Sequence, residues 1–203
     1  MMPNIPKTKI PIILAEQTIE YLGYQDYMHK ANPFLKPLLK IDIAKIKYWE
    51  HYFWNQADKL IAMSVDDQEF IKKESHKKLN ISVVANGVDL DFFARTQKKL
   101  PHDPTVLFVG TFKWLPNIEA VDEIVKDIWP LILKKLPRAK LNIVGFSPTQ
   151  KIKNYAHDPS INVLGDIADI RDAFARAHVL LAPIRSGKGT RYKVLEAMIS
   201  NSP

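Results

Sequence analysis

The sequence predicts an α/β protein built from two lobes, each with a parallel β-sheet. Three observations lead to this fold class. Short β-branched runs recur along the chain, segments with helical spacing of apolar residues lie between them, and a polar stretch with two prolines separates the two halves. Strand and helix alternating at this spacing form right-handed βαβ units, and such units make parallel sheets.

The second half of the chain alternates most regularly. We expect four strands, at residues 105–110, 139–145, 161–165 and 178–183. We expect helices at residues 117–129, 149–156 and 168–177, and from Arg191 onward. Asn117 is a residue type that favours the N-cap position, so it is the expected cap of the first of these helices.

Three of these four strands end in glycine, at Gly110, Gly145 and Gly165. Ligands of parallel sheets bind beyond the carboxyl ends of the strands. A glycine there either lets the backbone approach a ligand or simply forms a tight turn. Each glycine alone favours the turn, whereas their recurrence favours a nucleotide-type site.

The first half is less regular. It predicts strands at residues 10–16 and 59–64 and from Ile81, the last followed by a turn at Asn86–Gly87. It predicts helices at residues 36–58 and 64–74, the second with Ser64 as N-cap and Asp67 near a capping-box position. We assign residues 1–95 to the first lobe, 96–104 to a linker and 105–203 to the second lobe.

Composition limits the classes of protein that fit. The chain has 203 residues, 46% of them hydrophobic, and no cysteine, which excludes disulfides and thiolate metal sites. It has no apolar run long enough to span a membrane. Its N-terminus lacks the features of a signal peptide and it has no cysteine, so a cytoplasmic location is the default expectation. Six histidines show no metal-ligand spacing, and no metal or cofactor is expected.

The net charge of +7 lies mostly in the second half, where residues 97–203 hold 16 Lys and Arg against 10 Asp and Glu. Such an excess fits nucleic acid, an acidic membrane or a phosphorylated small molecule, and it equally fits a lysine-rich surface. Nucleic-acid binding calls for basic residues alternating with exposed aromatics along one face, and the sequence lacks this pattern.

The most informative segment is SGKGTRYKVLEAM, from Ser186 to Met198. With Thr190 as N-cap and a helix from Arg191, Gly187 and Gly189 lie in the loop at the helix mouth. Free N–H groups and the helix dipole favour a phosphate at such a position.

Three cations in this segment, Lys188, Arg191 and Lys193, supply compensating charge. Glu196 lies one turn deeper, where a carboxylate can accept hydrogen bonds from a ribose diol. The spacing therefore fits a sugar nucleotide. It fits equally well a surface loop followed by a helix with an ion pair between Lys193 and Glu196.

The segment resembles the donor-binding segment of family 4 glycosyltransferases, which have the GT-B fold of two Rossmann-like lobes. Further segments follow that family in order and spacing: VGTFKWLPNIEAV (109–121), LNIVG (141–145), INVLGDIADI (161–170), LLAPIRSGKGTRYKVLEAM (180–198), VVANGVDLDFF (83–93) and ILAEQTIEY (13–21). Together they cover essentially the whole chain. The resemblance also implies that both lobes are incomplete and that the chain is truncated at both ends.

The resemblance implies transfer of a sugar from a nucleotide diphosphate donor to an acceptor hydroxyl, with retention at the anomeric carbon and without a metal. It implies a saccharide or lipid-linked acceptor and a role in cell-envelope glycan synthesis. Arg191 and Lys193 would be the catalytic cations beside the diphosphate. The implied donor-binding residues are Glu196 at the ribose, Gly165 near the base, Gly110 and Lys113 near the phosphates, and Gly187, Lys188, Gly189 and Thr190 in the helix-mouth loop.

Two positions depart from the family pattern. Lys188 stands where many members carry a glutamate, and Gln17 stands where related sequences often carry a histidine, so the role of that histidine does not transfer. An inactive GT-B fragment that at most binds nucleotide is therefore the alternative reading. The predicted helix 36–58 carries both apolar residues and lysines, so it either packs on the core or contacts the inner face of an anionic membrane peripherally.

Overall fold

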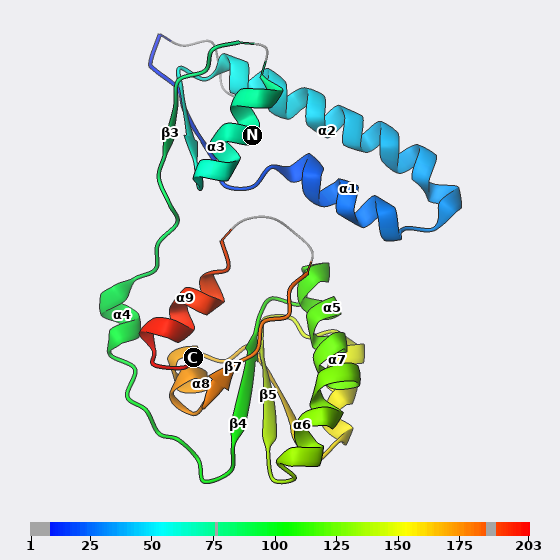
Figure 1. Cartoon of the computed structure of the whole chain (residues 1–203), viewed down its shortest axis with the longest axis vertical. Helices are drawn as coiled ribbons and strands as arrows, with labels where there is room; N and C mark the ends of the chain where they lie inside the picture. Colours follow the sequence, from blue (N-terminus) through cyan, green and yellow to red (C-terminus); the bar gives the residue numbers. More distant parts are fainter. Residues whose placement is uncertain (1–8, 76, 186–189) are drawn as a thin grey trace. The chain divides into compact units, whose positions relative to one another are not determined.

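The computed structural model describes residues 9–75, 77–185 and 190–203. The chain divides into two compact units (Figure 1). The first runs to Asn86, and the second comprises Gly87–Arg185 and Arg191–Pro203. Both are α/β units with parallel sheets, as the sequence predicts.

The first unit has a three-stranded parallel sheet in the order β1-β2-β3. Its strands are β1 (Ile13–Glu16), β2 (Lys59–Ala62) and β3 (Ile81–Val83). Its helices are α1 (Glu20–Lys30), α2 (Lys36–Gln56) and α3 (Val65–Glu74), with a short 3₁₀ helix, η2 (Pro33–Leu35), before α2. Leu60 and Ala62 of the central strand are buried and form a core with Trp54, Tyr21 and Ile71.

The predicted cap of α3 is confirmed. The Ser64 hydroxyl accepts a hydrogen bond from the Asp67 backbone N–H at 3.0 Å and donates to the Asp67 carboxylate at 2.6 Å. The helix α1 was not predicted. No side chain caps it locally, and Glu50 of α2 instead accepts from the backbone N–H groups of Glu20 and Tyr21. Its first turn therefore depends on a residue 30 positions away.

The second unit has a four-stranded parallel sheet in the order β6-β5-β4-β7. Its strands are β4 (Thr105–Val109), β5 (Lys140–Gly145), β6 (Ile161–Gly165) and β7 (Val179–Leu180). Its helices are α4 (Leu90–Ala94), α5 (Leu115–Glu123), the π-helical turn η3 (Ile124–Ile128), α6 (Trp129–Lys135), α7 (Gln150–Asn154), η4 (Tyr155–His157), α8 (Arg171–Ala175) and α9 (Tyr192–Ile199).

Helices cover both faces of this sheet (Figure 1). The α5, α6 and α7 helices lie on one face, where Val106 and Phe108 of β4 point. The α4, α8 and α9 helices lie on the other, where Leu107 packs with Phe174. Successive β4 residues are buried on opposite sides, which explains the unbroken apolar run from Val106 to Val109.

Two predicted helix starts are wrong. The helix expected from Asn117 begins at Leu115, after Trp114 as N-cap and with Pro116 in its first turn. Asn117 is therefore inside the helix, where its side chain is 3% exposed. Likewise, Thr190 does not cap the last helix, because Arg191 occupies the N-cap position without a side-chain cap bond.

The segment expected as a linker, residues 96–104, lies within the second unit and makes several contacts there. The Lys98 Nζ donates to the backbone carbonyl oxygens of Phe174 and Ala177, both at 2.9 Å, and to the Ser202 hydroxyl. The Lys99 backbone N–H donates to the Ala175 oxygen at 2.9 Å. Lys98 thereby joins this segment to the end of α8 and to the residues after α9.

Candidate functional site

The carboxyl ends of three strands in the second unit are tied to one another. The Gly110 backbone N–H donates to the Val144 carbonyl at 3.0 Å, and the Phe112 N–H donates to the Phe146 carbonyl at 3.0 Å. Gly145 and Gly165 are register partners across β5 and β6. The three glycines noted in the sequence therefore lie along one edge of the sheet.

Each of these glycines is explained by a close protein neighbour. A Cβ at Gly110 would lie 2.7–2.9 Å from the amide atoms of Asn117, and one at Gly145 would lie 1.7 Å from the Gly110 carbonyl oxygen. A Cβ at Gly165 would lie 3.0 Å from Pro148. A side chain at Gly145 would collide with the Gly110 backbone, and one at Gly110 would collide with the Asn117 side chain of α5. Both glycines therefore have a reason within the protein, whether or not a ligand binds there.

Lys193, from the first turn of α9, extends its side chain to this edge. Its Nζ donates to the Asn117 Oδ1 at 2.8 Å and lies 4.4 Å from the centre of the Phe108 ring. It forms no ion pair with Glu196 within the described part of the chain, so the surface ion pair that the spacing allowed is not formed. The structure instead directs this cation to the end of β4 and the first turn of α5.

Burial perturbs the charged groups of α9. Desolvation lowers the pKa of Lys193 to about 8, with a further contribution from the nearby charge of Arg191. Desolvation also lowers the pKa of Arg191. The two cations lie at the N-cap and in the first turn of one helix, and both are partly withdrawn from water. This position suits an anionic group.

Glu196 is also half-buried, one turn deeper in α9 than Lys193. Burial raises the pKa of its carboxyl group, and the Lys193 charge opposes that rise. A partly desolvated carboxylate gains most from hydroxyl donors, because they replace the water that it has lost. The arrangement of cations at the helix start and one acid deeper in therefore persists in the folded unit.

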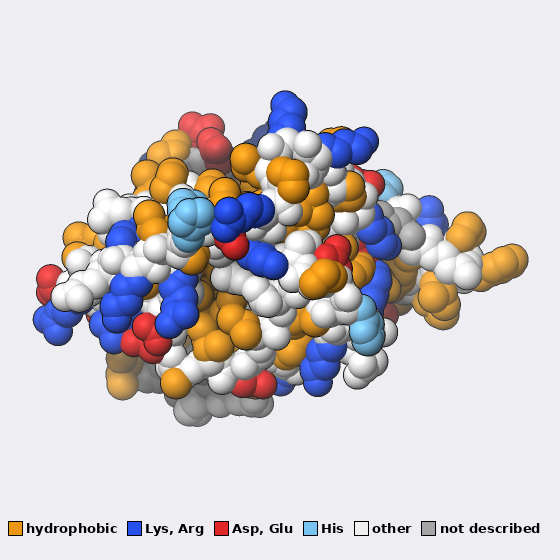
Figure 2. All heavy atoms as spheres, turned by 90° about the horizontal axis from the view of Figure 1, so that it is seen from below, with side chains coloured by type: hydrophobic (Ala, Val, Ile, Leu, Met, Phe, Trp, Pro, Cys, Tyr) orange, Lys and Arg blue, Asp and Glu red, His pale blue; other side chains and the backbone are white. Residues whose placement is uncertain are grey.

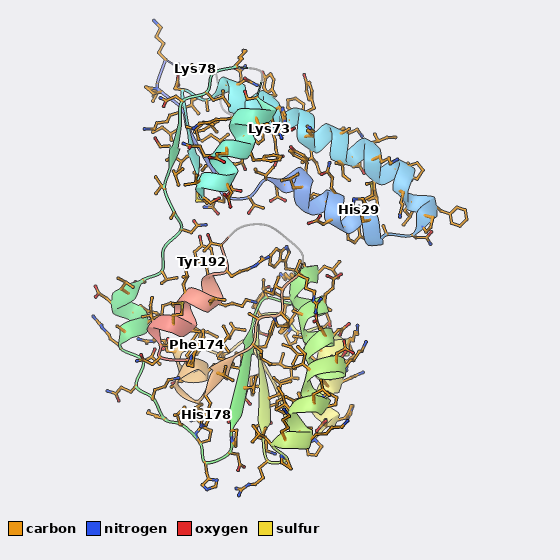
Figure 3. All side chains as sticks on the ribbon, in the orientation of Figure 1. His29, Lys73, Lys78, Phe174, His178 and Tyr192 are labelled. Carbon is orange, nitrogen blue, oxygen red and sulfur yellow. The ribbon has the colours of Figure 1, made fainter. Side chains whose placement is uncertain are left out.

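The other predicted residues of the strand-end loops lie nearby. The Lys113 Nζ lies 5.0 Å from the centre of the Phe146 ring, which links the loops after β4 and β5. Gly165 borders an open pocket of about 330 Å³ with Asp166 and Lys153 among its lining residues. Tyr192, labelled in Figure 3, lies at the start of α9, whereas His178 lies near the opposite end of the sheet.

Some of the predicted site lies outside the described residues: Gly187, Lys188 and Gly189. Thr190 precedes the N-cap residue of α9 and is half-buried. The sequence analysis missed Asn117 as a site residue, because an asparagine near a helix start suggests a cap. The Pro-Asn pair at residues 116–117 held a signal, since proline favours the first turn of a helix and so places the following asparagine inside it.

The described residues contain no group of three or more His, Asp or Glu side chains placed to hold a metal ion. None of their helices is both long and apolar enough to cross a membrane. On the face shown in Figure 2, Lys and Arg side chains are interspersed with apolar, neutral and acidic ones, and they form no continuous basic stripe.

Comparison with known proteins finds a family match within the second unit. Residues 103–203 match the model of the family described as glycosyl transferases group 1. A search of curated protein sequences finds no significant match.

Solved structures match almost the whole chain at low identity. Sucrose-phosphate synthase from Thermosynechococcus elongatus matches with a TM-score of 0.68 and 18% identity over 97% of this chain and 50% of its own. WaaG, a glycosyltransferase involved in lipopolysaccharide biosynthesis, matches with a TM-score of 0.68 and 14% identity over 97% of this chain and 56% of its own.

A third match is Anabaena Alr3699/HepE in complex with UDP and glucose, with a TM-score of 0.58 and 15% identity over 95% of this chain and 51% of its own. A fourth solved structure, TarM, matches 78% of this chain, and this match covers 31% of TarM. The chain thus spans about a third to just over half of each of these four solved chains. These likenesses show that it has the GT-B fold, with both lobes incomplete relative to those chains.

Proposed function

We propose that the protein is a glycosyltransferase that transfers a sugar from a nucleotide diphosphate donor to an acceptor hydroxyl. The observation that carries this proposal is the placement of Lys193 and Arg191. Lys193 points from α9 to the glycine-rich strand ends, and both cations are partly desolvated. The family match over residues 103–203 and the UDP complex of one structural neighbour support it.

In this proposal the diphosphate lies between the strand ends and the start of α9. Arg191 and Lys193 are the catalytic residues, because they neutralise the charge that develops as the bond between the anomeric carbon and the diphosphate breaks. The departing diphosphate oxygen keeps the electrons of the broken bond. The acceptor oxygen forms the new bond to that carbon and passes its proton to the diphosphate. These two cations take the part that a metal ion plays in other transferases, so the proposed reaction needs no metal.

The remaining residues bind the donor. Glu196 accepts hydrogen bonds from the ribose hydroxyls, and Gly165 lies near the base. Gly110, Lys113, Gly187, Lys188, Gly189 and Thr190 complete the phosphate side. Retention at the anomeric carbon is part of the proposal, and the anomeric configuration of the product, read by NMR, tests it.

The acceptor side of the proposal rests on the first unit. Exposed lysines on its helix α2 include Lys40 and Lys45. The same helix exposes five large apolar side chains: Leu38, Ile41, Tyr48, Trp49 and Tyr52. An amphipathic surface of this kind suits the cytoplasmic face of an anionic membrane and a saccharide acceptor carried on a lipid. Sedimentation with anionic vesicles tests this part, with Trp49→Ser and Tyr48→Ser expected to reduce binding and neutral vesicles as the control.

The donor site is tested by thermal-shift titration of the 203-residue chain with UDP, GDP and ADP and their sugar conjugates. We expect one diphosphate to raise the melting temperature and Glu196→Ala to reduce that rise. Asp172→Ala, which removes an acidic residue of α8 in the same unit, is the control and should keep the rise.

A folded chain that no diphosphate stabilises would contradict the proposal and support the alternative of an inactive GT-B fragment. Stabilisation by a diphosphate without sugar transfer to any acceptor would indicate nucleotide binding alone. An assay of sugar transfer from the conjugate that binds therefore distinguishes an active enzyme from an inactive fragment that only binds nucleotide.

A further inference from the structure

Asn117 connects three parts of the second unit through a side chain that is almost completely buried. It comes from the first turn of α5 and is 3% exposed. Its Nδ2 donates to the Thr111 carbonyl oxygen at 2.8 Å, and its Oδ1 accepts from the Lys193 Nζ at 2.8 Å. One amide thus joins the loop after β4, the start of α5 and the start of α9.

The structure also makes room for this amide. The nearest atoms to a Cβ at Gly110 would be the three amide atoms of Asn117, at 2.7–2.9 Å. Gly110 is therefore required so that Asn117 can lie against the strand end. A leucine or alanine at position 117 would fill some of the same space but would leave the Thr111 carbonyl and the Lys193 ammonium without these partners.

We propose that Asn117 is a positioning residue that holds Lys193 in place to bind the diphosphate of the donor. It touches neither the donor nor the acceptor. It acts by fixing the direction of a long, flexible side chain, which otherwise samples many rotamers. Because the same amide also holds the Thr111 carbonyl, it keeps the loop after β4 and the Lys193 cation in a constant relative position.

A neutral amide suits this task better than a carboxylate. An aspartate at position 117 would pair with Lys193 by charge and compete with an anionic ligand, and it would place an oxygen against the Thr111 carbonyl oxygen. Phe108 contributes from the other side, because its ring face lies 4.4 Å from the Lys193 Nζ. Lys193 is thus held by one neutral acceptor and one ring, and its charge is not cancelled by either.

The inference rests on the proposed function for its ligand, and its main test is a double-mutant cycle in UDP affinity. We expect Asn117→Ala to weaken UDP binding about tenfold when Lys193 is present. In a Lys193→Met background, the same change should have almost no effect, because the residue that Asn117 positions is gone. Asn162→Ala is the control: it removes a β6 amide that donates to Asn142 of β5, and it should leave UDP affinity unchanged.

A merely structural role of Asn117 would weaken UDP binding equally in both backgrounds, and that result would overturn the proposal. Each variant is first checked for a cooperative melt. If Asn117→Ala does not melt cooperatively, Asn117→Ser takes its place in the same cycle.

A second measurement needs no nucleotide. Competitive acetylation over a pH series, read by mass spectrometry, measures the titration curve of the Lys193 ammonium group in the folded wild-type chain. We expect Asn117→Asp to shift that titration to higher pH, because a carboxylate would then face the ammonium group at the position of the present amide.

An unchanged Lys193 titration in Asn117→Asp would show that the two side chains are not in contact and would overturn the inference. Failure of the wild-type chain to bind any diphosphate, together with the expected titration shift, would instead count against the proposed function alone. The two failures are therefore distinguishable.

Discussion

At the scale of single residues, close packing at the sheet edge decides which side chains can occur there. Gly110 and Gly145 face each other so closely that a Cβ on Gly145 would lie 1.7 Å from the Gly110 carbonyl oxygen. Gly110 in turn leaves room for Asn117. By contrast, a Cβ at Gly87 would meet nothing within 4 Å. Glycines at strand ends are often attributed to ligand approach, but here the protein itself accounts for them.

Lys193 leads to a prediction about pH. Its pKa of about 8 means that the free protein loses this charge as the pH rises above 8, while a bound diphosphate would raise the pKa by stabilising the charged form. UDP affinity should therefore fall by up to about tenfold per pH unit above pH 8. Isothermal titration calorimetry between pH 7 and pH 10 measures this fall.

The control for that profile is Lys193→Arg, whose guanidinium stays charged throughout the same pH range. We expect its UDP affinity to be lower than wild type at pH 7, because the Asn117 contact is lost, but nearly independent of pH. A wild-type affinity that stays level up to pH 10 would show that Lys193 does not meet the diphosphate as a cation.

At the scale of elements, local signals predicted what local chemistry determines. The strands β4, β5 and β6 and the Ser64 cap were predicted because β-branched runs and cap residues act within a few positions. The helix α1 was missed because its first N–H groups bond to Glu50, far along the chain. No pattern within residues 20–30 contains that information.

The candidate site shows the same difference between features set by local sequence and contacts between distant residues. The helical periodicity of the last helix indicated that Arg191, Lys193 and Glu196 share one element, and the structure places them in its N-cap and first two turns. The Asn117–Lys193 bond joins residues 76 positions apart, so no spacing rule could reveal it. Single residues were therefore predictable where one helix presents them and unpredictable where two elements meet.

The contact between α1 and α2 predicts a second pH effect. Burial raises the pKa of Glu50 to about 7, although its two backbone hydrogen bonds oppose the rise. The folded chain then binds more protons than the unfolded chain between pH 4.5 and pH 7. The contribution of Glu50 to the free energy of unfolding should therefore fall as the pH rises through this window and then level off.

Glu50→Gln should remove that contribution, because an amide does not titrate. Urea unfolding of both proteins at pH 5, 6 and 7 measures it, with Asp42→Asn on the exposed face of the same helix as the control. A variant that keeps the full wild-type pH dependence between pH 5 and pH 7 would mean that Glu50 ionises normally in the folded chain.

At the scale of the whole molecule, the hydrophobic cores follow the two units. Among the described residues, the cluster around Trp54 and Leu60 is formed by the first unit, and the clusters on the two faces of the second sheet are formed by the second. Cores that share no residues can unfold in separate transitions. Each unit should therefore respond to its own mutations.

Lys98 and Ser64 test this independence by calorimetry. Lys98→Met removes three hydrogen bonds from one ammonium group in the second unit and should destabilise that unit by about 2 kcal/mol, since part of the loss is offset by the relief of burying a charge. Lys99→Met, with an exposed side chain one position later, is the matched control.

Ser64→Ala removes the α3 cap and should destabilise the first unit by about 1 kcal/mol. We expect each change to lower one of two calorimetric transitions and to leave the other in place. If both transitions move together in either variant, the two units unfold as one cooperative body, and their separate cores do not make them independent.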